Sequence, residues 1–167
     1  YHFHTMKILI PTKLDKAAAG ALTAAGYEVV QNDSDPIDVQ AAANPDAVGL
    51  IVRSEKVTPA VIDSMPTLKC IIRAGAGYDN IDLAAATAHN VVAENTPGQN
   101  ANAVAELVFG LLVMAVRGFY NGKSGSELLG KKLGILAFGN VGRNVARIAK
   151  GFGMDVYAYD AFCPAEV

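Results

Sequence analysis

The sequence lacks tryptophan and has only two cysteines among its 167 residues. Cys70 lies in an apolar run and Cys163 precedes a proline, so the sequence predicts no disulfide framework. This cysteine usage is typical of a reducing compartment, and we expect the protein in the cytoplasm. No cluster of cysteine and histidine has the spacing of metal ligands, so we expect no metal site.

An excess of charge of one sign is lacking too. The 14 lysines and arginines nearly balance 16 acidic residues, which gives a net charge of −2. Such a balance provides neither a basic field for nucleic acid nor a polybasic patch for a membrane surface. The longest apolar run, 107–116, is too short to span a bilayer. Residues 1–5 precede a natural start at Met6 and are interpreted as a tag remnant.

Short apolar runs alternate with helical patterns over residues 6–100. The runs predict strands at 7–10, 27–30, 48–52, 68–72 and 91–93, with helices at 15–25, 37–43, after Thr58-Pro59, and at 82–89. The runs are apolar throughout rather than alternating, which indicates helices on both faces of a parallel sheet. We therefore predict an α/β domain with a flavodoxin-like doubly wound sheet over residues 6–100.

A long helix is predicted over 101–120, followed by a polar, glycine-rich segment, and we interpret 101–126 as an interdomain helix and linker. Its apolar face of Leu107, Leu111 and Met114 fits either a core or a dimer interface. A strand at 132–136, a helix at 141–152 and a strand at 155–159 follow. Because a Rossmann domain contains about six strands, residues 127–167 are predicted to be only its first part, and we expect this chain to be inactive alone.

A motif of the form A-x-G-x-x-G occupies residues 137–142, between a predicted strand and a predicted helix. Gly139 would let the backbone approach a pyrophosphate, and Gly142 would let helix and strand pack closely. Asp160 follows Gly142 by 18 residues, about where a carboxylate binds the ribose hydroxyls. The alternative is a simple bend with glycines for packing, but Asp160 favours dinucleotide binding, and its charge favours NAD over NADP.

Three predicted strands end in loops suited to an anion. These loops begin with Arg53-Ser54, with Arg73 and the turn 74–77, and with the segment 95–100. Ligands of open parallel sheets bind beyond the carboxyl ends of the strands. Two arginines and a glycine-rich turn with free N–H groups therefore predict an anion site. The alternative is that both arginines form ordinary surface ion pairs.

Four segments together resemble the D-2-hydroxyacid dehydrogenases: Val52-Arg53-Ser54, the run RAGAGYDNID at 73–82, NTPGQN at 95–100, and VAEL at 104–107. The resemblance runs from about Met6 to the end of the chain. It implies a flavodoxin-like substrate-binding domain, a Rossmann domain and NAD as cofactor. The resemblance assigns substrate binding to Arg53, Ser54, Arg73, Ala74, Gly75 and Gly77, and contacts with NAD to Ala76, Asn100, Val104, Gly139, Asn140, Val141, Gly142 and Asp160. The family's catalytic residues are expected beyond Val167, and none is assigned here.

The resemblance further implies the oxidation of D-3-phosphoglycerate to 3-phosphohydroxypyruvate, in serine biosynthesis, by a homodimer that binds a phosphorylated 2-hydroxy acid. Two alternatives stay open: another dehydrogenase of the family that reduces glyoxylate or hydroxypyruvate, and a non-catalytic NAD-sensing protein similar to corepressors of the same fold. One departure from the family pattern is Ala137, which stands where the first glycine is usual.

Overall fold

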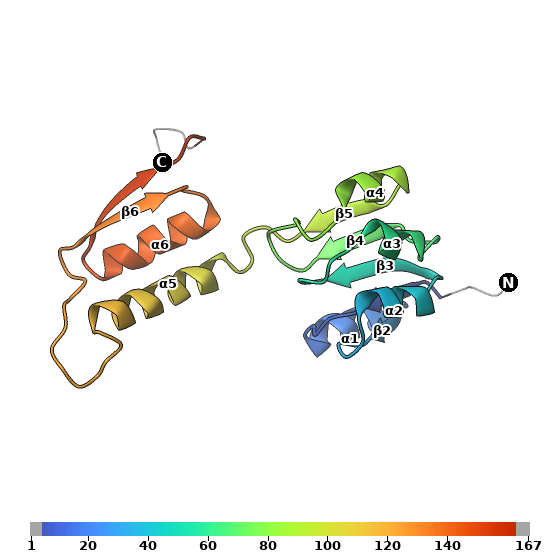
Figure 1. Ribbon diagram of the computed structural model, residues 1–167, viewed down its shortest axis with the longest axis horizontal. Helices are drawn as coiled ribbons and strands as arrows, with labels where there is room; N and C mark the ends of the chain where they lie inside the picture. The colour runs from blue at the N-terminus through green and yellow to red at the C-terminus, as the bar shows by residue number, and fades with distance from the viewer. Residues whose placement is uncertain (1–4, 163–167) are drawn as a thin grey trace. The chain divides into compact units, whose positions relative to one another are not determined.

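The computed structural model describes residues 5–162, and its contacts divide the chain between Pro97 and Gly98 into two compact units. We describe each unit by itself (Figure 1). The proposed tag residues 1–4 and Cys163 lie outside the described residues.

The first unit contains a five-stranded parallel sheet with the order β2-β1-β3-β4-β5. This is the flavodoxin-like order, which confirms the predicted fold class. The elements are β1 (Lys7–Ile10), α1 (Lys16–Ala24), β2 (Glu28–Gln31), α2 (Ile37–Ala43), β3 (Ala47–Val52), α3 (Pro59–Asp63), β4 (Cys70–Arg73), α4 (Leu83–Ala88) and β5 (Val92–Asn95).

Three helices of this unit begin at polar caps that satisfy their first N–H groups. The side chain of Asp15 accepts a hydrogen bond from the N–H of Ala17 in α1. Thr58 and Asp82 cap α3 and α4 in the same way. Such caps stabilise a helix by about 1 kcal/mol each, so the polar residues between apolar runs set where the helices begin.

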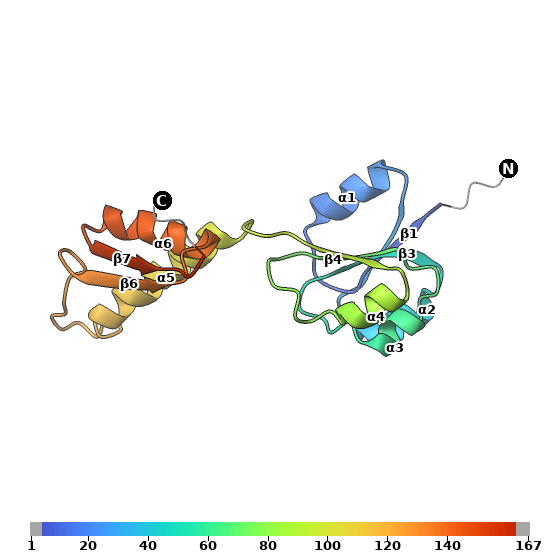
Figure 2. The ribbon, with the colours of Figure 1, turned by 90° about the horizontal axis from the view of Figure 1, so that it is seen from above.

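The core of the first unit lies against the face of the sheet that α2, α3 and α4 cover. Leu9, Leu50 and Ile71 are completely buried. In Figure 2, α2, α3 and α4 cover one face of the sheet and α1 lies on the other. Helices therefore flank both faces, as predicted, but the face of α1 is less covered, since Ile51 and Ile72 are only half-buried.

The second unit contains α5 (Ala101–Val116), β6 (Lys132–Leu136), α6 (Asn140–Gly151) and β7 (Asp155–Tyr159). Strands β6 and β7 are parallel, with Lys132 paired to Asp155 and Leu136 to Tyr159. The core of this unit joins α5, α6 and β6 through Ala105, Phe109, Leu128, Ile135, Val145, Ala146, Ala149 and Met154. The ring of Phe109 stacks on that of Phe152, with centroids 5.1 Å apart.

One expectation about α5 is wrong, and one of two alternatives for its apolar face is excluded. The helix ends at Val116 rather than near residue 120, because Gly118, Phe119 and Tyr120 adopt left-handed backbone conformations that no helix continues through. The face of Leu107, Leu111 and Met114 is not core: Leu107 is 61% exposed and Leu111 59%. The buried side of α5 packs on α6 instead, so the helix belongs to the second unit.

No helix among residues 5–162 has the length and apolar character needed to cross a membrane.

We expect Leu50→Ala to lower the free energy of unfolding of the first unit by about 2–5 kcal/mol, since it removes a completely buried side chain. Urea unfolding, followed residue by residue through amide signals, measures the effect in each unit. Signals of Ile135 and Ala149, which lie in the other core, serve as the internal control. An equal loss of stability in both units would contradict the division into separate cores.

Candidate functional site

Two arginines meet at the carboxyl edge of the first sheet. Strands β3 and β4 pair in register, with Val52 opposite Arg73, so the loops after them begin side by side. The Nε of Arg73 donates a hydrogen bond to the carbonyl of Arg53 at 2.9 Å. The guanidinium of Arg73 lies so close over Gly75 that a Cβ at this position would overlap it. A side chain at 75 would therefore displace the guanidinium of Arg73 from this position.

The loop after β3 is held by a carboxylate that sequence reasoning missed. The N–H of Arg53 donates to Oε2 of Glu55 at 2.7 Å. Burial raises the pKa of Glu55, but hydrogen bonds from the backbone N–H groups of residues 53–55 and from Thr12 outweigh it and keep the pKa below its usual value. Nη1 of Arg53 also donates to the carbonyl of Lys13 at 3.4 Å.

Asn80 is a second residue that was missed. Its Nδ2 donates to the carbonyl of Glu55 at 2.8 Å and to that of Arg53 at 3.4 Å. The only signal in the sequence was its place within the segment 73–82. The loops after β3 and β4 thus form one hydrogen-bonded group around the two arginines.

The turn 74–77 is tied to the loop after β5. Nδ2 of Asn95 donates to the carbonyl of Ala76 at 2.6 Å, and the N–H of Thr96 donates to that of Gly75 at 2.9 Å. Not every N–H group of this turn is free, because those of Ala74 and Gly75 donate to the carbonyls of Val52 and Arg73. These two hydrogen bonds leave the N–H groups of residues 76 and 77 as the donors that the turn can offer an anion.

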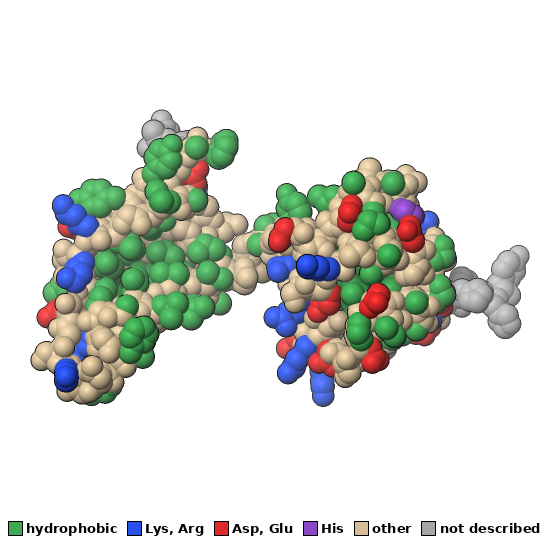
Figure 3. Space-filling model, viewed as in Figure 1, with side chains coloured by type: hydrophobic (Ala, Val, Ile, Leu, Met, Phe, Trp, Pro, Cys, Tyr) green, Lys and Arg blue, Asp and Glu red, His purple; other side chains and the backbone are tan. Residues whose placement is uncertain are grey.

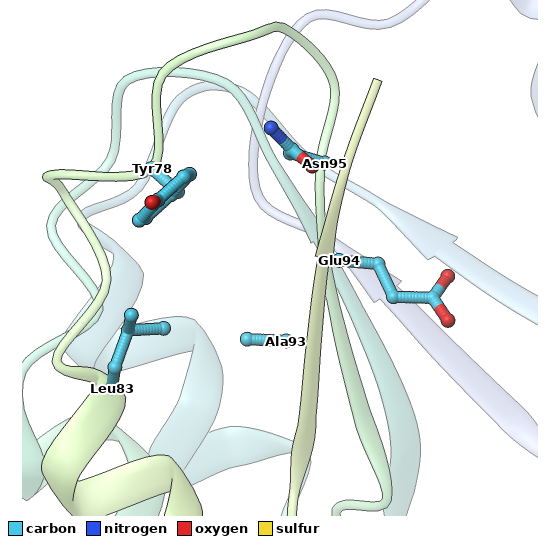
Figure 4. Close-up of a pocket in the computed structure, with 5 residues that line it drawn as sticks. All are labelled: Tyr78, Leu83, Ala93, Glu94 and Asn95. Carbon is cyan, nitrogen blue, oxygen red and sulfur yellow. The ribbon is translucent and has the colours of Figure 1, made fainter. Parts of the chain in front are cut away.

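A small pocket of about 160 Å³ lies beside this turn. Figure 4 shows the side chains of Tyr78, Leu83 and Ala93 facing one another, while Glu94 points away to the other side of β5. Asn95 also lines the pocket, and its amide donates to the carbonyl of Ala76 in the turn.

In the second unit, the loop between β6 and α6 has the geometry that the glycine motif predicts. Ala137 adopts a left-handed φ of 76°, the conformation for which glycine is usual. A Cβ on Gly142 would overlap the carbonyl of Ala137, whereas one on Gly139 would meet no atom within 4 Å. Gly142 thus permits close packing, and Gly139 faces open space at the N-terminus of α6, where a phosphate would find N–H donors.

Asp160 lies beside this loop, at the end of β7. Its Oδ2 accepts the N–H of Phe138 at 2.6 Å, and its Oδ1 accepts that of Phe162 at 2.8 Å. A carboxylate is therefore fixed next to the glycine loop, where a ribose would meet it. The loop, the helix terminus and this carboxylate together fit a dinucleotide.

The remaining predicted positions lie on α5 and at the start of α6. Asn100 is the N-cap residue of α5 without a side-chain hydrogen bond to the helix, and Val104 is exposed on that helix. Asn140 is the first residue of α6, and its amide lies against Gly98. Val141 follows it and is 37% exposed.

A third missed residue is Arg143. Its Nε donates to the carbonyl of Phe138 at 3.1 Å, and its guanidinium lies over the ring of that residue. Its place directly after Gly142 was the only signal in the sequence.

Within residues 5–162, the ion pair that involves a histidine lies away from the two arginines. His89 pairs with Asp63 at 2.9 Å, but it precedes β5 and so lies at the amino edge of the sheet, opposite the arginines. Within the same residues, no group of three or more His, Cys, Asp or Glu side chains is arranged to hold a metal ion.

The family model and the similar proteins all indicate 2-hydroxyacid dehydrogenases. The family model of the D-isomer specific 2-hydroxyacid dehydrogenase catalytic domain matches residues 8–160. The chain is 39% identical to D-3-phosphoglycerate dehydrogenase of Rattus norvegicus over 96% of its length, and 42% identical to hydroxypyruvate reductase of Thermotoga maritima over 72%. The NAD+-bound 3-phosphoglycerate dehydrogenase of Entamoeba histolytica superposes over 97% of the chain, with a TM-score of 0.85 and 38% identity.

The chain spans only part of these proteins. It covers 33% of the rat enzyme, 44% of the Thermotoga enzyme and 56% of the Entamoeba structure.

The two glycines of the loop differ in a way that stability measurements can separate. We expect Gly142→Ala to destabilise the second unit by about 1–3 kcal/mol, since its Cβ would overlap a backbone carbonyl. Gly139→Ala is the matched control and should change stability by no more than about 0.5 kcal/mol. Urea unfolding of both variants measures the difference, and equal losses would contradict the assigned packing role of Gly142.

Proposed function

The chain belongs to the D-isomer specific 2-hydroxyacid dehydrogenase family, and we propose that it forms part of an enzyme that oxidises D-3-phosphoglycerate at C2 with NAD. The product is 3-phosphohydroxypyruvate, and the reaction begins the synthesis of serine.

The observation that carries this proposal is that Arg53 and Arg73 lie at one sheet edge, where Nε of Arg73 donates to the backbone carbonyl of Arg53 at 2.9 Å. D-3-Phosphoglycerate carries a phosphate and a carboxylate, and guanidinium groups are well suited to bind both. The N–H groups of residues 76 and 77 add neutral donors. Ser54, directly after Arg53, contributes a hydroxyl at the same edge.

In the second unit, NAD is held by the loop 137–142 and Asp160. The N-terminus of α6 and the open space at Gly139 accept the pyrophosphate. Asp160 accepts hydrogen bonds from the ribose hydroxyls, and its charge disfavours the 2′-phosphate of NADP. Bound NAD supplies the hydride acceptor for the oxidation.

The two arginines have a binding role only. Arginine stays protonated in proteins, so neither guanidinium takes the proton from the substrate hydroxyl. Instead, the pair orients the substrate by its two anionic groups, which fixes the carbon between them for hydride transfer.

The 42% identity to hydroxypyruvate reductase supports a second candidate of the same reaction class. That enzyme is named for a substrate without phosphate. A comparison of kcat/KM for D-3-phosphoglycerate and D-glycerate in the complete enzyme separates the two, and a preference for D-glycerate would contradict our proposal.

We further propose that the enzyme is a cytoplasmic homodimer. The exposed apolar side chains of α5, which include Leu107, Leu111 and Met114, contribute to the hydrophobic area over this helix in Figure 3. Apolar patches of this kind mark interaction surfaces. Two copies that bury the same helix face would remove the patch from water.

We expect Asp160→Asn to lower the ratio of the NADP to the NAD dissociation constant roughly tenfold or more. The variant loses both the repulsion of the 2′-phosphate and a charged acceptor for the ribose hydroxyls. Titration calorimetry with each cofactor measures the ratio of dissociation constants. Asp155→Asn, at the other end of β7, is the control and should leave the ratio unchanged. An unchanged ratio in Asp160→Asn would show that this carboxylate only supports the loop.

Arg53→Ala should raise the KM for D-3-phosphoglycerate in the complete enzyme by roughly tenfold or more, since one charged hydrogen bond is lost. The KM for NAD should stay within about twofold, because Arg53 and the glycine loop belong to different units. Steady-state kinetics with each substrate varied in turn measures both constants, and Lys16→Ala, on the exposed start of α1, is the control. Equal changes in both constants would contradict a substrate-binding role.

A further inference from the structure

The glycine loop contains a backbone conformation that its own sequence disfavours. Ala137 has a φ of 76°. This left-handed conformation raises the free energy of a residue with a Cβ, whereas glycine adopts it without strain. Such conformations persist only where surrounding contacts fix them. The contacts around the neighbouring residue, Phe138, therefore decide how this loop keeps its shape.

Both sides of Phe138 are fixed by charged side chains. On one side, its N–H donates to Asp160 at 2.6 Å. On the other, its carbonyl accepts the Nε of Arg143 at 3.1 Å, while the guanidinium lies 5.8 Å from the centre of its ring. One hydrogen bond thus comes from the end of β7 and the other from the first turn of α6.

Arg143 is the less expected of the two partners. Its side chain is exposed, and exposed arginines usually extend into solvent, whereas this one folds back to make a hydrogen bond and a ring contact with the same residue. The bond orients the peptide group between Phe138 and Gly139, and it is the N–H of Gly139 that this group directs.

We propose that Arg143 is a positioning residue of the cofactor loop, which compensates for the alanine that stands in place of the first glycine. The assignment rests on the proposed function, since the fixed loop binds the pyrophosphate of NAD. The distinctive consequence is coupling: the contribution of Arg143 should depend on whether residue 137 is alanine or glycine.

A double-mutant cycle with Ala137→Gly and Arg143→Ala tests this coupling. In the natural background, we expect Arg143→Ala to weaken NAD binding about fivefold, which corresponds to the loss of one hydrogen bond. In the Ala137→Gly background, Arg143→Ala should weaken NAD binding by less than about twofold, because glycine adopts the left-handed conformation without support. Titration calorimetry of the complete enzyme with NAD measures all four variants.

Amide hydrogen exchange of the chain without NAD provides a second, independent measurement. Arg143→Ala should speed exchange at Phe138 about fivefold in the alanine background and leave it nearly unchanged in the glycine background. Exchange at Ile135, in the core of the same unit, should stay the same in all variants. Lys150→Ala removes one positive charge from the last turn of the same helix and should alter neither measurement.

The outcomes separate the two proposals. An equal effect of Arg143→Ala in both backgrounds would overturn the coupling and assign Arg143 a role through its charge alone. Faster exchange at Ile135 as well would show general destabilisation and would also overturn it. If the complete enzyme does not bind NAD, the cofactor part of the proposed function fails, while the exchange measurements still decide whether Arg143 fixes the loop.

Discussion

The parallel pairing of neighbouring strands is the constraint on which both candidate sites depend. In a parallel sheet every strand ends at the same edge, so residues distant in the sequence are brought together without any contact between their own side chains. The pairing of Val52 with Arg73 brings the loops after β3 and β4 together, and that of Leu136 with Tyr159 does the same for the glycine loop and Asp160. A shift of either register by one residue would send the functional side chain to the opposite face.

Most of the fold could be predicted from the sequence because its signals are local. Apolar runs mark the strands, and Thr58-Pro59 marks the start of α3. The end of α5 also had a local signal, which the prediction missed: Gly118 follows the C-cap Arg117 and adopts the left-handed conformation that ends many helices. Which face of α5 is buried depends on α6, and that choice has no local signal.

For the candidate sites, the sequence predicts positions better than interactions. Arg53, Arg73, Gly139 and Asp160 lie at the loops where the motifs predict them. Glu55, Asn80 and Arg143 were missed, because each acts on the backbone of a neighbouring loop residue rather than on a ligand. Hydrogen bonds of this kind depend on the path of the loop, which a residue pattern does not specify.

The two units use arginine in the same way. In each, the Nε of an arginine donates to a backbone carbonyl of an adjacent loop: Arg73 to residue 53, and Arg143 to residue 138. A guanidinium has five N–H donors in a fixed plane, so one bond through Nε orients the group and leaves the terminal nitrogens to other partners. Lysine has no equivalent, since its donors all lie on one rotating nitrogen. Each arginine thus fixes a loop and also places its positive charge beside that loop. In the proposed sites, a loop that is already fixed reduces the reorganisation that an incoming anion must cause.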